Sequence, residues 1–141
     1  METVASTIQL KWIDGTLMTA VDSGGRPLVV GSYAADIHEW RGLKGSDLLL
    51  VAAAACSTYD IITILQKQRQ PVEKLDVTCT GEQSKEPPHQ FTTMHLHYII
   101  KGNVDSDKVA KAIQLSVEKY CSVIATLKAA VEITTDFKVV T

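Results

Sequence analysis

A cysteine and an aspartate on one predicted helix are the residues with the clearest chemical potential. Asp60 follows Cys56 by four residues, and this spacing places both side chains on one helix face. A thiol acts as a nucleophile only as the thiolate, which needs a nearby cation or a helix N-terminus to lower its pKa. Cys56 lies in mid-helix beside a carboxylate, and neither feature lowers the pKa of its thiol. The alternative is a buried structural cysteine beside a paired aspartate, the usual role of a lone cysteine.

Two further cysteines complete the set. Cys79 alternates with Leu75 and Val77 on a predicted strand, so we expect a core residue rather than a reactive thiol. Cys121 lies on a second predicted helix. Three widely spaced cysteines do not make a secreted disulfide framework, and the lack of a Cys-x-x-Cys motif excludes a zinc knuckle and a thioredoxin motif.

Two histidines, His95 and His97, alternate on one predicted strand and could bind a metal together. No Asp, Glu or Cys is evident as a third ligand, so two solvated histidines are the favoured interpretation and no metal site is predicted. None of the four histidines is tied by local sequence to Cys56, which disfavours a cysteine hydrolase.

The helix that holds Cys56 is predicted over residues 46–70, without an internal Gly or Pro. Ser46 suits the N-cap, and Asp47 adds a negative charge to the first turn. No charge occurs over residues 48–59, so most of this surface must be buried. Because few other helices are predicted to cover it, we expect a homodimer that does not dissociate without unfolding.

The remaining elements surround this helix. Alternating patterns and turn residues predict strands over residues 6–13, 16–22, 28–31, 75–80, 91–101 and 131–139, and a helix from 105 or 106 through Cys121 to about 130. The order, three strands, a helix, two strands, two helices and a last strand, predicts one mixed α+β domain over residues 1–141, with helices packed on antiparallel sheet. The irregular, charged segment 32–45 either lines a site or is a solvated connector.

Composition narrows the class of protein. The chain has 141 residues, 45% of them hydrophobic, as in an ordinary soluble globular domain. A formal net charge of −2 disfavours nucleic-acid binding. We expect no signal peptide and no membrane span, since Asp60 interrupts the apolar helix too early for a bilayer. A cytoplasmic location is therefore predicted.

Two segments resemble the OsmC/Ohr family of thiol-dependent peroxidases, and within it the YhfA-like branch of predicted redox proteins. They are Ala-Ala-Ala-Ala-Cys-Ser-Thr-Tyr-Asp around Cys56 and Glu-Lys-Tyr-Cys-Ser-Val-Ile around Cys121. The resemblance implies an OsmC-like fold, in which antiparallel sheets wrap two long central helices of an intertwined homodimer. It also implies two active sites at the dimer interface.

The resemblance further assigns roles to residues. Cys56 matches the peroxidatic cysteine of the family, and Cys121 matches the resolving cysteine. The family also uses an arginine from the loop before the helix, for which Arg41 is the best match. The family's glutamate at the helix start is replaced here by Ser46, with Asp47 next to it.

By the same resemblance, attack on a peroxide gives a sulfenic acid at Cys56, and Cys121 condenses with it to a disulfide. An external dithiol of the lipoyl type then reduces the disulfide, and no bound cofactor is implied. An organic hydroperoxide is the expected substrate because the surrounding side chains are largely apolar. The residues expected to bind it are Tyr59, Asp60, Tyr120 and Trp40.

A second hypothesis remains open: a non-enzymatic redox sensor, or a binder of a small apolar or thiol-bearing ligand in the same pocket. Retention of both cysteines favours the peroxidase, whereas the missing glutamate favours the alternative. Consumption of an alkyl hydroperoxide with dihydrolipoamide separates the two.

Overall fold

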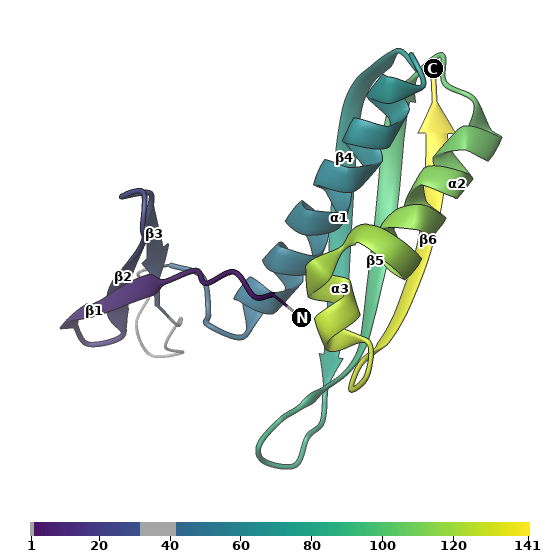
Figure 1. The fold of residues 1–141 in the computed structure, drawn as a ribbon. Helices are drawn as coiled ribbons and strands as arrows, with labels where there is room; N and C mark the ends of the chain where they lie inside the picture. The colour runs from purple at the N-terminus through teal and green to yellow at the C-terminus, as the bar shows by residue number, and fades with distance from the viewer. Residues whose placement is uncertain (1, 32–41) are drawn as a thin grey trace. The chain divides into compact units, whose positions relative to one another are not determined.

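The computed structural model describes residues 2–31 and 42–141 of the chain. Its element order is the predicted one, with a short π-helix (η1) added between the last two helices (Figure 1). The chain divides into two compact units, Met1–Leu49 and Leu50–Thr141, which are described separately. The expectation of one domain over the whole chain stays a prediction.

The first unit is a three-stranded antiparallel meander, as predicted. Its strands are β1 (Ile8–Asp14), β2 (Leu17–Asp22) and β3 (Pro27–Val30), in the order β1-β2-β3. The turn after β2 is held by Asp22, which accepts hydrogen bonds from the amides of Gly24 and Arg26 and pairs with the Arg26 guanidinium at 2.9 Å. Several apolar side chains of this sheet are exposed: Ile8, Leu10, Trp12, Leu28 and Val29.

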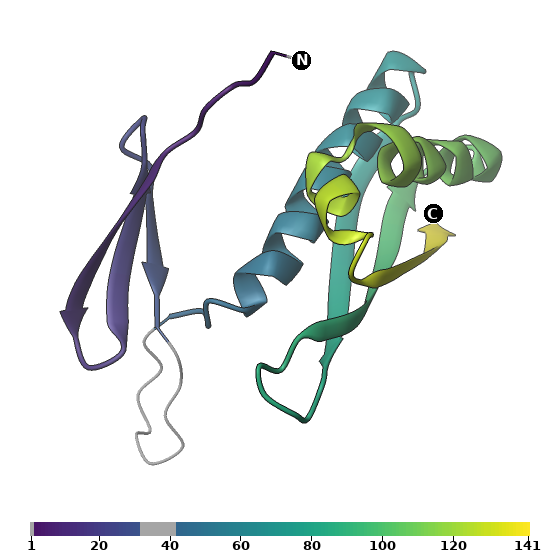
Figure 2. The same ribbon diagram turned by 60° about the horizontal axis from the view of Figure 1, so that its bottom comes forward.

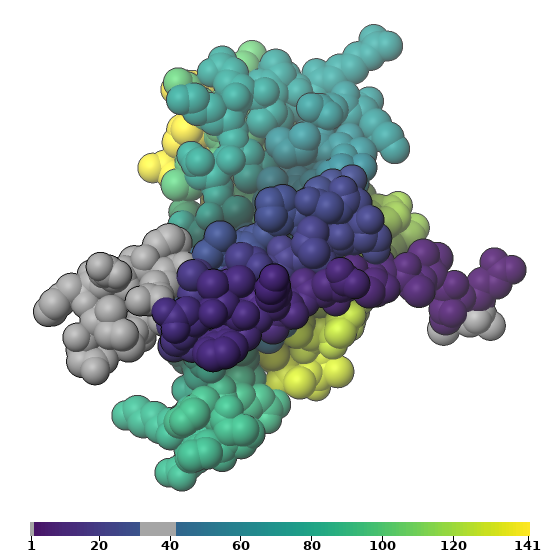
Figure 3. Space-filling view, turned by 90° about the vertical axis from the view of Figure 1, so that its left-hand side faces the viewer, coloured from purple at the N-terminus to yellow at the C-terminus, as the bar shows by residue number. Residues whose placement is uncertain are grey.

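The second unit contains the long helix α1 (Asp47–Lys67), which enters it from the first, and a sheet in the order β4-β5-β6. α1 ends before the predicted residue 70 because Arg69 takes a left-handed φ of 57° and Pro71 follows. β4 (Val72–Gln83) and β5 (Phe91–Gly102) are antiparallel. The loop between them stands out as a teal projection in Figure 3.

The last strand, β6 (Glu132–Val140), pairs in parallel with β5. The expectation of an entirely antiparallel sheet is therefore wrong for this strand. The connection between β5 and β6 is helical and more than a dozen residues long, which is what a parallel pair requires.

The core of the second unit lies between this sheet and its helices. Figures 1 and 2 show α1 and two later helices, α2 (Ser106–Leu115) and α3 (Ser122–Leu127), on one face of the sheet. Alternate residues of β5 point into this core, whereas His95 and His97 lie on the other face, as their alternation predicts. Cys79 packs against the core, as expected, and burial raises the pKa of its thiol. The β5 residues that are buried are Phe91, Met94, Leu96, Tyr98, Ile100 and Gly102.

The second helical region holds two helices, as the predicted order has it, but the helical pattern that runs on through Cys121 in the sequence is interrupted there. α2 (Ser106–Leu115) begins as expected, with Asp105 accepting from the amides of Asp107 and Lys108. It is followed by η1 (Ser116–Tyr120), a break at Cys121, and α3 (Ser122–Leu127). The break arises because Cys121 adopts φ −74° and ψ 109°, which is extended backbone rather than helix.

By length and composition alone, α1 could cross a membrane. An 18-residue window has a mean hydropathy of 2.0, and 22% of it is buried within the chain. The sequence argument that Asp60 interrupts this run too early is therefore insufficient by itself. The core helix of a soluble protein passes the same test, so the absence of a membrane span stays a prediction.

Candidate functional site

The two cysteines that the sequence singled out come together in the second unit. Cys56 projects from α1, and Cys121 lies at the junction of η1 and α3. Cys121 belongs to the buried core cluster against which Cys56 packs, each thiol shifts the pKa of the other, and the Ser122 hydroxyl lies 3.8 Å from the Cys56 sulfur. Cys121 is 1% exposed, whereas Cys56 is partly exposed. The accessible thiol is therefore the one predicted to meet the peroxide.

The environment of Cys56 favours its thiolate. Partial burial raises the pKa of this thiol, but hydrogen bonds from the Val123 amide, the Cys121 thiol and the Ser122 hydroxyl and amide outweigh that effect. The pKa of Cys56 is thus lower than that of an ordinary thiol. The amides belong to the first turn of α3, whose N–H groups have no partners within the helix.

Ser122 and Val123 thus provide a stabilisation of the Cys56 thiolate that the sequence of α1 does not reveal, and the role expected for Arg41 stays a prediction. A signal was present, because Cys121 and Ser122 are small residues with polar tips of the kind that interrupt and cap helices. In the structure, the Cys121 sulfur accepts a hydrogen bond from the Ile124 amide at 3.4 Å and so caps α3.

Cys121 has the opposite environment. Burial, together with a hydrogen bond to the Cys56 sulfur and the charge of that sulfur, raises the pKa of the Cys121 thiol to about 11, and the Ile124 and Val123 amides only partly oppose this. Cys56 is consequently the thiol of the pair that loses its proton more readily.

Asp60 is tied into the fold on the same face of α1. Its Oδ2 accepts a hydrogen bond of 2.8 Å from the hydroxyl of Ser116, a fully buried residue at the start of η1. Nearby, the Ser57 hydroxyl donates to the Ala53 carbonyl at 2.7 Å and lies 2.6 Å from the Tyr98 hydroxyl. These bonds join α1 to η1 and to β5.

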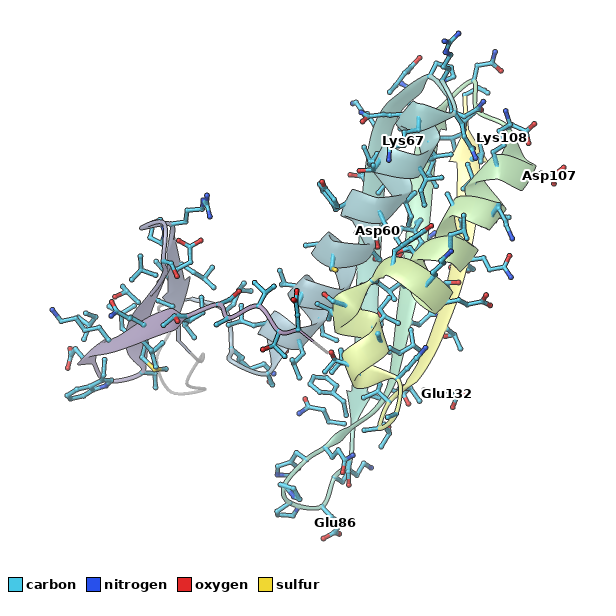
Figure 4. All side chains as sticks on the ribbon, in the orientation of Figure 1. Asp60, Lys67, Glu86, Asp107, Lys108 and Glu132 are labelled. Atoms are coloured by element: carbon cyan, nitrogen blue, oxygen red, sulfur yellow. The ribbon has the colours of Figure 1, made fainter. Side chains whose placement is uncertain are left out.

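A groove of about 520 Å³ runs between α1 and the end of the α2–η1 region. Three of the residues expected to bind substrate, Tyr59, Asp60 and Tyr120, line it together. Figure 4 shows Asp60 and Lys67 on α1, and both line this groove. The remaining lining residues are Thr63, Ile64, Gln68 and Leu115. Neither cysteine is among these residues, so the groove adjoins the thiol pair without containing it.

The other predicted site residues are placed differently. Arg41 and Trp40 lie outside the described residues. Asp47 begins α1, and its carboxylate lies 3.7 Å from the Lys44 ammonium, so its local partner is a lysine. Asp47 precedes Cys56 by two and a half helical turns, or about 13 Å along the axis.

The exposed face of the sheet holds a cluster that the sequence did not predict. Asp136 of β6 lies opposite His97, and its Oδ1 is 2.6 Å from the Nδ1 of His97 and 3.0 Å from the Nε2 of His95. The statement that no carboxylate accompanies these histidines is therefore wrong. Within residues 2–31 and 42–141, no group of three or more His, Cys, Asp or Glu side chains is arranged to hold a metal ion.

The sequence of this chain is similar to one family model and to curated proteins. The family model for OsmC-like proteins matches residues 38–136. Protein YhfA of Escherichia coli K12 is 36% identical over 133 residues, which cover 94% of this chain and 96% of YhfA.

Solved structures agree with this assignment. A hypothetical protein from Aquifex aeolicus VF5 has a TM-score of 0.82 at 27% identity, covering 97% of this chain and 98% of its own. The organic hydroperoxide resistance protein OhrB of Bacillus subtilis has a TM-score of 0.66 at 12% identity, covering 96% and 98%. The second likeness concerns the fold alone. The α+β fold is thus the expected OsmC-like one, and the chain belongs to the OsmC-like protein family.

Proposed function

We propose that this chain is a thiol-dependent peroxidase that reduces organic hydroperoxides through Cys56 and Cys121. The observation that supports this best is the unequal pair of adjacent thiols. One is partly exposed with a lowered pKa, and the other is buried with a raised pKa. Membership of the OsmC/Ohr family indicates a redox function related to peroxides, and the proposal makes that function specific.

The chemistry follows from the order of the pKa values. The Cys56 thiolate attacks the outer oxygen of the hydroperoxide, the O–O bond breaks, and the alkoxide takes a proton and leaves as the alcohol. Cys56 is then a sulfenic acid. The Cys121 sulfur displaces its hydroxyl group, which leaves as water with the Cys121 proton, and a disulfide forms. An external dithiol of the lipoyl type returns both thiols by exchange and is itself oxidised.

The groove beside the pair suits an organic peroxide. Tyr59 and Tyr120 are 73% and 53% exposed, so their rings are available to an apolar substituent. Ile64 and Leu115 add aliphatic surface to the same groove. We assign the organic part of the peroxide to this groove, with Trp40 as a further contact.

Arg41 is proposed as the cation that assists the attack. The first turn of α3 already favours the thiolate, so the arginine acts mainly on the charge that develops on the peroxide oxygens. Asp47 is proposed to orient it. An Arg41→Ala protein should react more slowly with peroxide and still form the disulfide.

A homodimer completes the proposal. Only 22% of the apolar window of α1 is buried by the chain itself, and Leu49 and Val51 are 41% and 47% exposed. A second copy that covers this helix removes the apolar surface from water. Light scattering at micromolar concentration tests the dimer, and a monomeric mass contradicts it.

The test of the activity is steady-state consumption of an alkyl hydroperoxide with dihydrolipoamide as reductant. Cys56→Ser should abolish turnover, and Cys79→Ser is the matched control because Cys79 is a core thiol with a raised pKa. Mass mapping after one equivalent of peroxide should show a Cys56–Cys121 bond and a reduced Cys79. A Cys56–Cys79 bond, or no bond, contradicts the mechanism.

The groove also supports a second candidate function, the binding of a small apolar or thiol-bearing ligand in a sensor without turnover. The supporting observation is that Cys56 and Cys121 are not among its described lining residues. A ligand could therefore occupy it without reaching the sulfurs. Saturable binding without peroxide consumption is the result that favours this function. In either case a cytoplasmic location is proposed, where dithiols keep the pair reduced.

A further inference from the structure

The position of Cys121 depends on the short π-helical segment before it. The Cys121 amide donates to the Ser116 carbonyl at 2.8 Å, which closes the five-residue turn of η1. A π-turn inserted in a helix shifts every later residue around the axis, and such turns are frequent at functional sites. The start of η1 therefore determines where the Cys121 sulfur lies.

Ser116 ties this start to the helix that holds Cys56. It is fully buried, and its hydroxyl has one proton to donate. The near acceptor is Asp60 Oδ2 at 2.8 Å, and the Ser57 carbonyl at 3.4 Å is the weaker one. Asp60 and Ser57 both belong to the turn of α1 that begins at Cys56. One hydroxyl thus links the backbone of the second cysteine to the helical turn of the first.

We infer that the hydrogen bond from Ser116 to Asp60 is a positioning element that holds the Cys121 sulfur against the Cys56 sulfur and so favours the disulfide. Ser116 contacts neither sulfur in any described hydrogen bond, and it acts through the backbone of η1. The inference rests on the proposed function only in that the disulfide is a step of the proposed cycle.

The test measures the disulfide without peroxide. Each protein has the Cys79→Ser change, so that one intramolecular disulfide is possible. Each variant is equilibrated with mixtures of reduced and oxidised dithiothreitol. The oxidised form accepts the two protons and two electrons that Cys56 and Cys121 lose when their disulfide forms. The readout is the equilibrium constant of the Cys56–Cys121 bond, from mass spectra after acid quench.

Ser116→Ala should lower this constant about tenfold, because a buried hydrogen bond to a carboxylate is lost. Tenfold corresponds to a reduction potential about 30 mV less negative. Asp60→Ala should have the same effect and provides the measurement should Ser116→Ala fail to fold. Asp60→Asn keeps an acceptor oxygen and should restore the constant to within about threefold of that of the parent protein.

Ser57→Ala is the matched control. Ser57 is also a fully buried serine, but its hydroxyl bonds to Ala53 and Tyr98 and not to η1. It should lower thermal stability and change the constant by less than about twofold. An equal fall in Ser57→Ala and Ser116→Ala, an unchanged constant in Ser116→Ala, or no disulfide in the parent protein overturns the inference. Failure of the proposed peroxidase is a separate result, since no step here uses a peroxide.

Discussion

The pKa of Cys56 can be changed by removing donors at the start of α3. Ser122→Pro removes both the amide and the hydroxyl that Ser122 offers to the Cys56 sulfur. The backbone is already suited to proline, because Ser122 is the first residue of α3 and Cys121 before it has an extended ψ of 109°. The expected result is a higher pKa of Cys56 with α3 retained.

The size of the shift follows from the donors that are lost. A hydrogen bond to a charged group contributes about 1.5–3 kcal/mol, which corresponds to about 1–2 pKa units. Cys56 is partly exposed, so water replaces part of this interaction, and we expect a rise of about 0.5–1 unit. Below the pKa, the thiolate fraction should then fall about three- to tenfold.

The assay is the rate of iodoacetamide labelling at Cys56 as a function of pH, resolved by mass spectrometry. The midpoint of the profile gives the pKa, and the rates above both midpoints should agree to within about threefold, the gain in nucleophilicity that accompanies a higher pKa, which shows that access is unchanged. Ser122→Ala is the control, because it removes the hydroxyl alone and should give a smaller rise. If the Ser122→Pro midpoint equals that of the unaltered protein, neither the amide nor the hydroxyl of Ser122 stabilises the thiolate and the reasoning is refuted.

Three further predictions concern stability. Ser57→Ala leaves the fully buried Tyr98 hydroxyl without its partner and should cost about 1–3 kcal/mol in urea unfolding, whereas adding Tyr98→Phe should cost less than the sum of the single changes. Gly81→Ala places a Cβ 2.7 Å from the Leu50 side chain and 2.8 Å from the Phe91 ring, and should cost about 1–3 kcal/mol by the same measurement; a neutral result would mean that both side chains can shift. The hydrogen bond from His97 lowers the pKa of Asp136, so the contribution of this carboxylate to the stability of the fold is present above pH 3.8 and is lost as pH falls through the lowered pKa. Asp136→Asn should therefore reduce the loss of stability on acidification, and an unchanged acid profile would contradict this.

The sequence alone predicted most of the elements and the two cysteines of the candidate site. Local periodicity gave the alternation of β5, the N-cap at Asp105 and the order of strands and helices, because these depend on neighbouring residues. The family motifs identified Cys56 and Cys121 as the pair, and the structure brings these two thiols together. The roles given to Arg41 and Trp40 concern residues outside the described part of the chain.

Only the tertiary structure decided how the pair is activated and positioned. The amides that stabilise the Cys56 thiolate come from α3, far along the chain, and no periodicity within α1 reveals them. The break at Cys121 was missed because no Gly or Pro marks it over residues 106–130, while the Ser116–Asp60 bond depends on how η1 packs against α1. The parallel pairing of β6 likewise follows from the path of the helical connection over the sheet. Contacts between distant segments set these features, and a local pattern does not record which distant segment will become the neighbour.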